Sequence, residues 1–139
     1  MPEASRIPFI SSHQLVLVSV IINRTKVFRF VVDTGAQRII ISHAVAQTLG
    51  LDVVHPIRFE AMVTAERQTP PAPVVLLASV QVGGMRLRNL EAIVFDLPPT
   101  LRADGLLGLN FLERFRVTFE FDRSTLILRP RAGKPSRTA

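Results

Sequence analysis

The chain has 139 residues, a length typical of one compact domain that can bury a core without cross-links. Cysteine is absent, which excludes disulfides, thiolate nucleophiles and cysteine-based metal sites. The three histidines, His13, His43 and His55, lack the spacing of metal ligands, and we expect neither a metal nor a cofactor.

The formal net charge is +6, and it is dispersed except for a basic cluster near the C-terminus. A positive surplus can attract nucleic acid, but the chain has no Tyr or Trp to stack on bases and no nucleic-acid motif. No stretch reaches the roughly 18 apolar residues of a membrane helix, and residues 1–10 lack a signal-peptide core. We therefore expect a cytoplasmic protein, or a fragment of a longer one, with no nucleic-acid partner and no membrane segment.

The first half of the chain predicts two strands and a helix. Residues 15–22 are almost all apolar, which is typical of a strand that is buried on both faces. Residues 27–32 predict a second strand, which follows a turn at 23–25 and resumes at 38–41 after a break at 34–36. Ser42 is the expected N-cap of a short helix that ends before Gly50.

The second half predicts further strands, a proline-rich loop and another short helix. Residues 53–64 are expected to form a strand, and 64–73 an exposed loop or hairpin tip, because proline disrupts a central ladder. A short helix is expected after Gly108, with Asn110 as its N-cap. The remaining strands are predicted at 74–82, 85–90, 91–95, 117–121 and 125–128.

Many short strands with two short helices predict a mostly-β protein, either a closed barrel or a sandwich. We divide the chain into an N-terminal arm at 1–12, a folded domain at 13–129 and a basic disordered tail at 130–139.

Asp33 is the most prominent candidate for chemistry. It follows a strand of apolar residues, and Thr34 and Gly35 place a hydroxyl and a flexible backbone beside its carboxylate. The tripeptide alone is more often an ordinary turn, since all three residue types favour turns. Its context favours a site, because the stretch 41–51 (ISHAVAQTLGL) and a later Leu106-Leu107-Gly108 accompany it.

With Ala36 added, these motifs resemble the retropepsin-like aspartic proteases, in their bacterial single-domain form. The resemblance covers residues 13–129 and implies a closed, acid-protease-like barrel with one or two short helices. It implies that Asp33 is the catalytic residue and that Thr34, Gly35 and Ala36 form the active-site loop that contacts the substrate.

The resemblance also implies a mechanism and an assembly. Family members hydrolyse peptide bonds with a water held between two aspartates that share one proton. The chain has a single Asp-Thr-Gly, and Asp104-Gly105 lacks the Thr hydroxyl, so the second aspartate is expected from a second chain. The implied protein is a homodimeric aspartic endopeptidase with a peptide or protein substrate.

The region of the expected flap departs from the family pattern. Its candidate residues, Thr64, Ala65, Glu66 and Arg67, include no glycine, which is common at a flap tip. This leaves an alternative open, a catalytically weak or inactive module retained for peptide binding or dimerisation. A regulatory protease that cuts a single partner protein is a further possibility.

The residues after Ala36 also differ from the usual pattern. Gln37 stands where a small hydroxyl or an acid is commoner, and Arg38 adds a cation that we expect to face solvent or the dimer edge. His43 is expected to be an exposed residue in the first helical turn, without a catalytic role.

Overall fold

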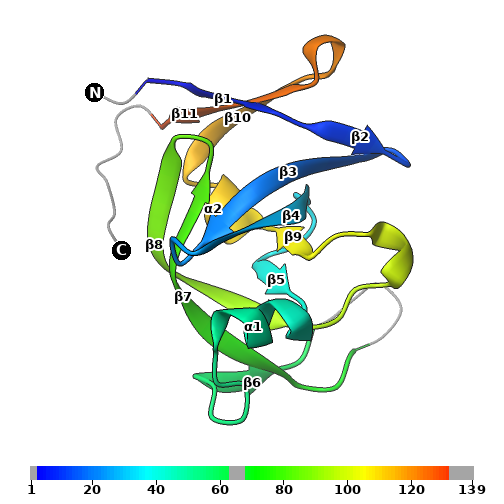
Figure 1. Cartoon of the computed structure of the whole chain (residues 1–139), viewed down its shortest axis with the longest axis vertical. Helices are drawn as coiled ribbons and strands as arrows, with labels where there is room; N and C mark the ends of the chain where they lie inside the picture. Colours follow the sequence, from blue (N-terminus) through cyan, green and yellow to red (C-terminus); the bar gives the residue numbers. More distant parts are fainter. Residues whose placement is uncertain (1–2, 63–67, 132–139) are drawn as a thin grey trace.

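The computed structural model describes residues 3–62 and 68–131, which form two β-sheets and two short α-helices (Figure 1). One sheet has the strand order β1-β11-β10. The other has the order β2-β3-β4-β9-β5-β8-β7-β6, with a further pairing between β3 and β7. The strands are β1 (Ser5–Pro8), β2 (Ile10–Ser12), β3 (Leu15–Ile22), β4 (Lys26–Val32), β5 (Ile39–Ile41), β6 (Arg58–Glu60), β7 (Ala72–Val82), β8 (Met85–Val94), β9 (Gly105–Leu107), β10 (Phe115–Glu120) and β11 (Thr125–Pro130). The helices are α1 (His43–Leu49) and α2 (Leu109–Leu112).

The prediction of a mostly-β fold is therefore confirmed. The segment 1–12, predicted as an arm, contains two strands, because β1 pairs with β11 and β2 pairs with β3. Most of the predicted tail, 132–139, lies outside the described residues. Within the described ranges, no helix is both long and apolar enough to cross a membrane.

The hairpin of β3 and β4 forms where the apolar pattern predicts it. Its three-residue turn has positive φ at Asn23 and Arg24, and the Thr25 N–H donates to the Ile22 carbonyl at 3.1 Å. Val18, Val20 and Ile22 are buried on one face of β3. On the other face Leu17 is buried and Ile21 is partly buried, whereas Ser19 is exposed, so the prediction of burial on both faces holds except at Ser19.

Helix α1 begins and ends as its capping residues predict. The Ser42 hydroxyl accepts a hydrogen bond from the Val45 backbone N–H at 3.1 Å. Gly50 terminates the helix at φ 71°, in the left-handed region that glycine adopts readily. Val45 and Ala46 are buried, so one side of this short helix packs on the sheet.

The strand predicted at 53–64 is much shorter in the structure. The Asp52 carboxylate accepts hydrogen bonds from the backbone N–H groups of Val54 and His55 at 2.9 and 3.0 Å, which folds this stretch into a turn. Pro56 follows and has no N–H to donate to a ladder. Strand β6 therefore begins only at Arg58 and ends at Glu60.

Two apolar clusters hold the fold together. The main core contains, among others, the fully buried Phe30 and Phe111, which lie between the two sheets and the helices. The second apolar cluster consists of four buried residues, Ile40, Ala72, Val74 and Ile93, with Met62, Phe95, Leu97 and Leu106 packed against them. It involves β5, β7, β8 and β9, and so adjoins the strands that carry the predicted site.

Candidate active site

Asp33 lies at the end of a central pair of parallel strands. Strand β4 pairs with β9 in the register Val31 to Leu106 and Val32 to Leu107. The Asp33 backbone N–H continues this pairing by donating to the Leu107 carbonyl at 3.1 Å. The carboxylate is thereby placed where the chain leaves the sheet, and its side chain is only partly buried.

The predicted active-site residues Thr34, Gly35 and Ala36 lie in a tightly folded loop, residues 33–38, which we call the active-site loop. The Gly35 N–H donates to the Asp33 carboxylate Oδ1 at 2.8 Å, and the Ala36 N–H donates to the Asp33 carbonyl at 3.2 Å. A Cβ at Gly35 would lie 3.2 Å from the same carboxylate oxygen, closer than most side-chain contacts. Glycine at this position therefore leaves room for the Asp33 carboxylate. The neighbouring Thr34 is exposed.

The segment that contains Leu106-Leu107-Gly108 packs against this loop and forms backbone hydrogen bonds with it. The backbone N–H groups of Leu109 and Asn110 donate to the carbonyls of Ala36 and Gln37 at 2.8 and 3.1 Å. A Cβ at Gly108 would overlap the carbonyl groups of Ala36 and Arg38. The two sequence motifs, far apart in the chain, are thus brought into direct backbone contact.

The prediction that Asn110 is the N-cap of the second helix is wrong. Helix α2 begins at Leu109, and its N-cap is Gly108, two residues before Asn110. The Asn110 side chain has other partners: it accepts from the Ile39 N–H at 2.9 Å and donates to the Glu91 carbonyl at 2.8 Å.

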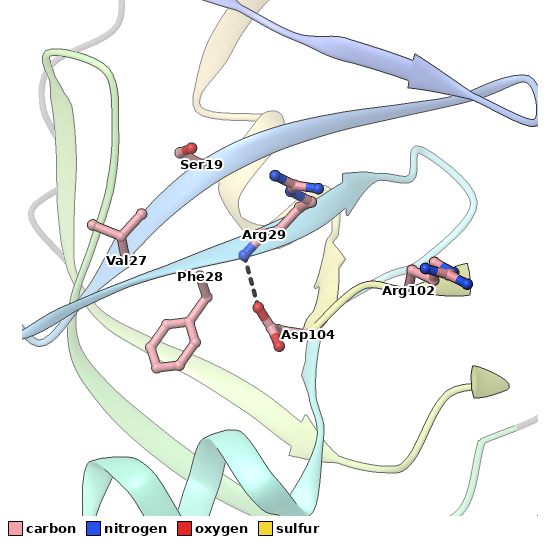
Figure 2. A pocket seen from close by; sticks show the side chains of 6 residues that line it. All are labelled: Ser19, Val27, Phe28, Arg29, Arg102 and Asp104. Carbon is pink, nitrogen blue, oxygen red and sulfur yellow. Dashed lines mark hydrogen bonds between the residues drawn. The ribbon is translucent and has the colours of Figure 1, made fainter. Parts of the chain in front are cut away.

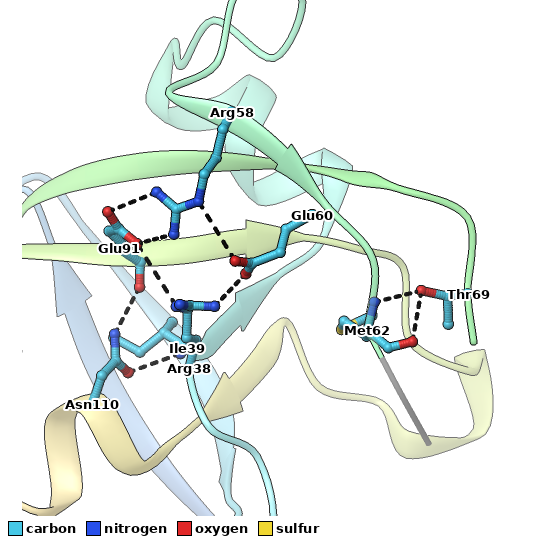
Figure 3. Close-up of polar contacts among 8 residues, drawn as sticks. All are labelled: Arg38, Ile39, Arg58, Glu60, Met62, Thr69, Glu91 and Asn110. Carbon is cyan, nitrogen blue, oxygen red and sulfur yellow. Dashed lines mark hydrogen bonds and ion pairs between the residues drawn. The ribbon is translucent and has the colours of Figure 1, made fainter. Parts of the chain in front are cut away.

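Arg38 does not face solvent as expected. Its guanidinium forms an ion pair with Glu60 on β6 and lies 3.7 Å from the Glu91 carboxylate on β8 (Figure 3). Arg58 completes the group, with two hydrogen bonds to Glu91 at 2.7 and 3.1 Å. We call these four side chains the charge cluster. Their formal charges sum to zero.

The pairing within the charge cluster has an electrostatic consequence. Hydrogen bonds from Arg58 hold the pKa of the Glu91 carboxyl below its ordinary value, and burial opposes this effect. The same bonds raise the pKa of the Arg58 guanidinium. Each shift favours the charged form of its group, so the two charges stabilise one another.

Asp104 does not stand beside Asp33 as a second catalytic acid. Its carboxylate accepts a hydrogen bond from the Arg29 N–H at 2.9 Å (Figure 2). Its own N–H donates to the Arg29 carbonyl at 2.8 Å. Asp104 thus fastens the start of β9 to β4. It also borders a shallow hollow of about 370 Å³ that is lined by Ser19, Val27, Phe28, Arg29, Arg102 and Asp104, and not by Asp33.

The flap candidates Thr64, Ala65, Glu66 and Arg67 lie outside the described residues. The residues on either side of this segment meet. The Met62 N–H donates to the Thr69 hydroxyl at 2.9 Å, and the Thr69 N–H donates to the Met62 carbonyl at 2.9 Å. The contact between Met62 and Thr69 brings together the two ends of the segment predicted as the flap.

The histidines lie on the surface, as predicted for His43 in the first turn of α1. His43 lies 3.2 Å from the Asp96 carboxylate and also donates its backbone N–H to it, which lowers the pKa of the Asp96 carboxyl. Within the described residues, no group of three His, Asp or Glu side chains is placed to hold a metal ion.

Comparison with known sequences places this site in a family. Residues 18–114 match the family model described as "gag-polyprotein putative aspartyl protease". The chain is also 31% identical over 115 residues to the uncharacterized protein RP867 of Rickettsia prowazekii (strain Madrid E), a match that covers 80% of this chain and 45% of that protein. The chain thus spans less than half the length of this curated relative.

Two solved structures are similar to the fold described above. One is a retropepsin-like aspartic protease from Rickettsia conorii, with a TM-score of 0.63 and 29% identity, covering 91% of this chain and 90% of that chain. The other is the retroviral protease-like domain of Ddi1 from Leishmania major, with a TM-score of 0.53 and 20% identity, covering 87% and 94% of the two chains. Because the family model spans most of the chain, including both sequence motifs, the chain belongs to the retropepsin-like, gag-polyprotein type of aspartyl protease family.

Proposed function

We propose that the protein is an aspartic endopeptidase that hydrolyses peptide bonds as a homodimer. The observation that carries the proposal is the position of Asp33, whose carboxylate is held at the end of the central β4–β9 pair by the backbone of its own loop. Each chain supplies one such carboxylate, so two copies are needed for the pair that aspartic chemistry requires.

In the proposed mechanism, the two Asp33 carboxyl groups hold one water between them. The ionised carboxylate takes a proton from this water, and the protonated partner donates a hydrogen bond to the carbonyl oxygen of the scissile peptide. Two carboxylates at contact distance share one proton because both cannot ionise cheaply. Thr34 would link the two loops across the twofold axis, and Gly35 and Ala36 would contact the substrate backbone.

The surroundings of Asp33 support a peptide or protein substrate. Val31 lies opposite Leu106, and Leu106 lies opposite Ile40 of the second apolar cluster. Because side chains alternate along a strand, Asp33 continues the face of Val31, two residues earlier. Val31 and Ile40 are buried, but Leu106 is only partly buried, so Leu106 would offer substrate side chains an apolar contact beside the carboxylate pair.

The proposal is tested by replacing the carboxylate without changing its shape. Purified protein is incubated with a mixed peptide library between about pH 4 and 7, the range suggested by paired carboxylates, and products are identified by mass spectrometry. Asp33→Asn should abolish cleavage, whereas Asp122→Asn, a matched change in an exposed turn, should leave it intact. Cleavage by the Asp33→Asn protein at the wild-type rate would refute the proposal.

A second candidate is a peptide-binding or dimerisation module without useful turnover. The absence of glycine from Thr64, Ala65, Glu66 and Arg67 favours it, because a flap needs backbone freedom to close over a substrate. Binding of a statine-type inhibitor with no cleavage at any pH would support this alternative. Cleavage of one natural partner alone would instead support a dedicated regulatory protease.

A further inference from the structure

The charge cluster of Arg38, Arg58, Glu60 and Glu91 connects the active-site loop to a neighbouring part of the sheet (Figure 3). Arg38 is the last residue of the loop and directly precedes β5. Glu60 is the last residue of β6. Their ion pair therefore joins two segments that are separated in sequence and that no backbone ladder connects directly, since β8 and β7 lie between β5 and β6.

The register of the sheet places the charge cluster on one face. Glu60 lies opposite Ala72, and Arg58 lies opposite Val74. Residues directly opposite in antiparallel strands share a face, so Arg58 and Glu60 lie on the face of the second apolar cluster, to which Ala72 and Val74 belong. The ion pairs thus lie beside the second apolar cluster, which adjoins the strands of the candidate site.

Glu60 also lies close to the base of the predicted flap. Met62 lies two residues further on and forms two hydrogen bonds of 2.9 Å with Thr69. The Met62 N–H donates to the Thr69 hydroxyl, and the Thr69 N–H donates to the Met62 carbonyl. Only Ala61 separates the ion-paired end of β6 from Met62 and its contact with Thr69. Arg38 is therefore placed to control the distance between the active-site loop and the base of the flap segment.

The contacts divide the charge cluster into two pairs with different geometry. Arg58 on β6 and Glu91 on β8 form a bidentate pair across the intervening strand β7. Arg38 contacts Glu60 directly, while its distance to Glu91 is longer, at 3.7 Å. Arg58 lies 3.5 Å from Glu60, so it supports the Glu60 carboxylate without reaching the loop.

We propose that Arg38 is a positioning residue that sets the width of the substrate site. Through its ion pair with Glu60, it holds β6 and the base of the flap segment against the loop that carries Asp33. The expected effect on kinetics rests on the proposed function. The ion pair between the active-site loop and β6 does not depend on that function. Arg38 acts through Glu60 and does not itself touch the reacting atoms.

The test compares Arg38→Met with a matched variant, Arg58→Met, which removes the other arginine of the same cluster. Arg38→Met should lower kcat/KM about five-fold, mainly through a higher KM, because a loosened site binds the substrate less well. Arg58→Met should change kcat/KM less than two-fold in rough terms, since the loop keeps its link to Glu60. Arg38→Lys should restore most of the loss, because a lysine retains one ion pair with Glu60.

Amide hydrogen exchange provides a readout that needs no catalysis. Arg38→Met should speed exchange of the Met62 and Thr69 amides about five-fold, and Arg58→Met should leave these two amides closer to wild type. Equal effects of the two variants on exchange and on kcat/KM, or no effect of Arg38→Met on either, would overturn the inference. A wild-type protein without any Asp33-dependent cleavage would refute the proposed function, while the exchange data would still decide the role of Arg38.

Discussion

The Asn110 side chain accepts a hydrogen bond from the Ile39 backbone N–H at 2.9 Å, which ties helix α2 to the strand that follows the active-site loop. The amide group of the same side chain donates to the Glu91 carbonyl at 2.8 Å. One side chain therefore satisfies two backbone groups from two different strands, β5 and β8. Its role is to fix the position of the loop relative to the sheet.

Asn110→Leu should destabilise the protein by about 2–4 kcal/mol, because it leaves two partly buried backbone groups without partners. Urea denaturation followed by circular dichroism would measure the change in unfolding free energy. Gln47→Ala, at an exposed position of α1, is the control and should change stability little. A loss below about 0.5 kcal/mol for Asn110→Leu would show that water replaces both hydrogen bonds.

Gly105 and Gly108, which flank Leu106 and Leu107, should tolerate no side chain. A Cβ at Gly105 would overlap the Ile40 carbonyl, and one at Gly108 would overlap the Arg38 carbonyl, both rigid backbone atoms beside the loop. Gly108→Ala should therefore cost about 3 kcal/mol or more, since the backbone must shift to relieve the overlap.

The matched control for this change is Gly84→Ala. A Cβ at Gly84 would meet only the Ser5 side chain, at 3.5 Å or more, and its φ does not require glycine. Thermal unfolding of the two variants should separate them by many degrees, given how strongly a small domain responds to such a cost. Similar melting temperatures for Gly84→Ala and Gly108→Ala would show that the loop yields to the added methyl group.

The sequence predicts those parts of the site whose causes are local. The Ser42 cap, the Gly50 terminus and the Asp33 motif each depend on neighbouring residues, and the structure places the first two as predicted. The sequence connects the Asp33 motif with Leu106-Leu107-Gly108 only through the family resemblance. The spacing of the two motifs does not predict that their backbones are in contact. The structure supplies the reason, which is the close approach that Gly108 permits.

The charge cluster could not be predicted because it depends on register between distant strands. Arg38, Glu60 and Glu91 belong to three segments whose alignment is set by the β6–β7 and β7–β8 pairings. The alternation of Arg58 and Glu60 around an exposed Phe59 was the available signal that both charges share a face. This pattern is hard to see when 53–64 is predicted as one long strand. In the structure the Asp52 turn takes up the first part of that segment, and the strand has only three residues.

The pairing of Glu91 predicts how stability depends on pH. Its pKa in the folded protein lies below the ordinary value of 4.5, mainly because Arg58 donates to the carboxylate. A lowered folded pKa stabilises the protein above the unfolded pKa, and this contribution is lost as the pH falls through the folded value. The difference in unfolding free energy between wild type and Glu91→Gln should therefore be constant near neutral pH and shrink below about pH 4.5.

The effect should be small, because the Glu91 side chain is 34% exposed and salt screens its interaction with Arg58. Urea denaturation of both proteins between about pH 3 and 7 would measure it, with Glu113→Gln at an exposed position as the control. A difference that grows as the pH falls would have the wrong sign for a carboxylate with a lowered pKa and would contradict the pairing.

Mixing active and inactive chains tests whether two copies share one site. If each site needs one Asp33 from each chain, wild-type protein mixed with an equal amount of Asp33→Asn protein should fall to about half its activity once subunits have exchanged. A nine-fold excess of the variant should lower it to about one tenth, because almost every wild-type chain then has an inactive partner. The wild-type concentration is the same in every mixture.

The control for mixing is the Asp33→Asn, Arg38→Met double variant set against Asp33→Asn alone, since both supply an inactive partner with the same charge at position 33. Equal inhibition by the two would show that loss of the Arg38 ion pair with Glu60 leaves subunit exchange intact. Activity that stays constant at any excess of the variant means that one chain suffices for cleavage. The single Asp33 carboxylate would then need a different acid as its partner. Because the Asp104 carboxylate accepts a hydrogen bond from the Arg29 backbone, that acid would have to come from elsewhere in the chain.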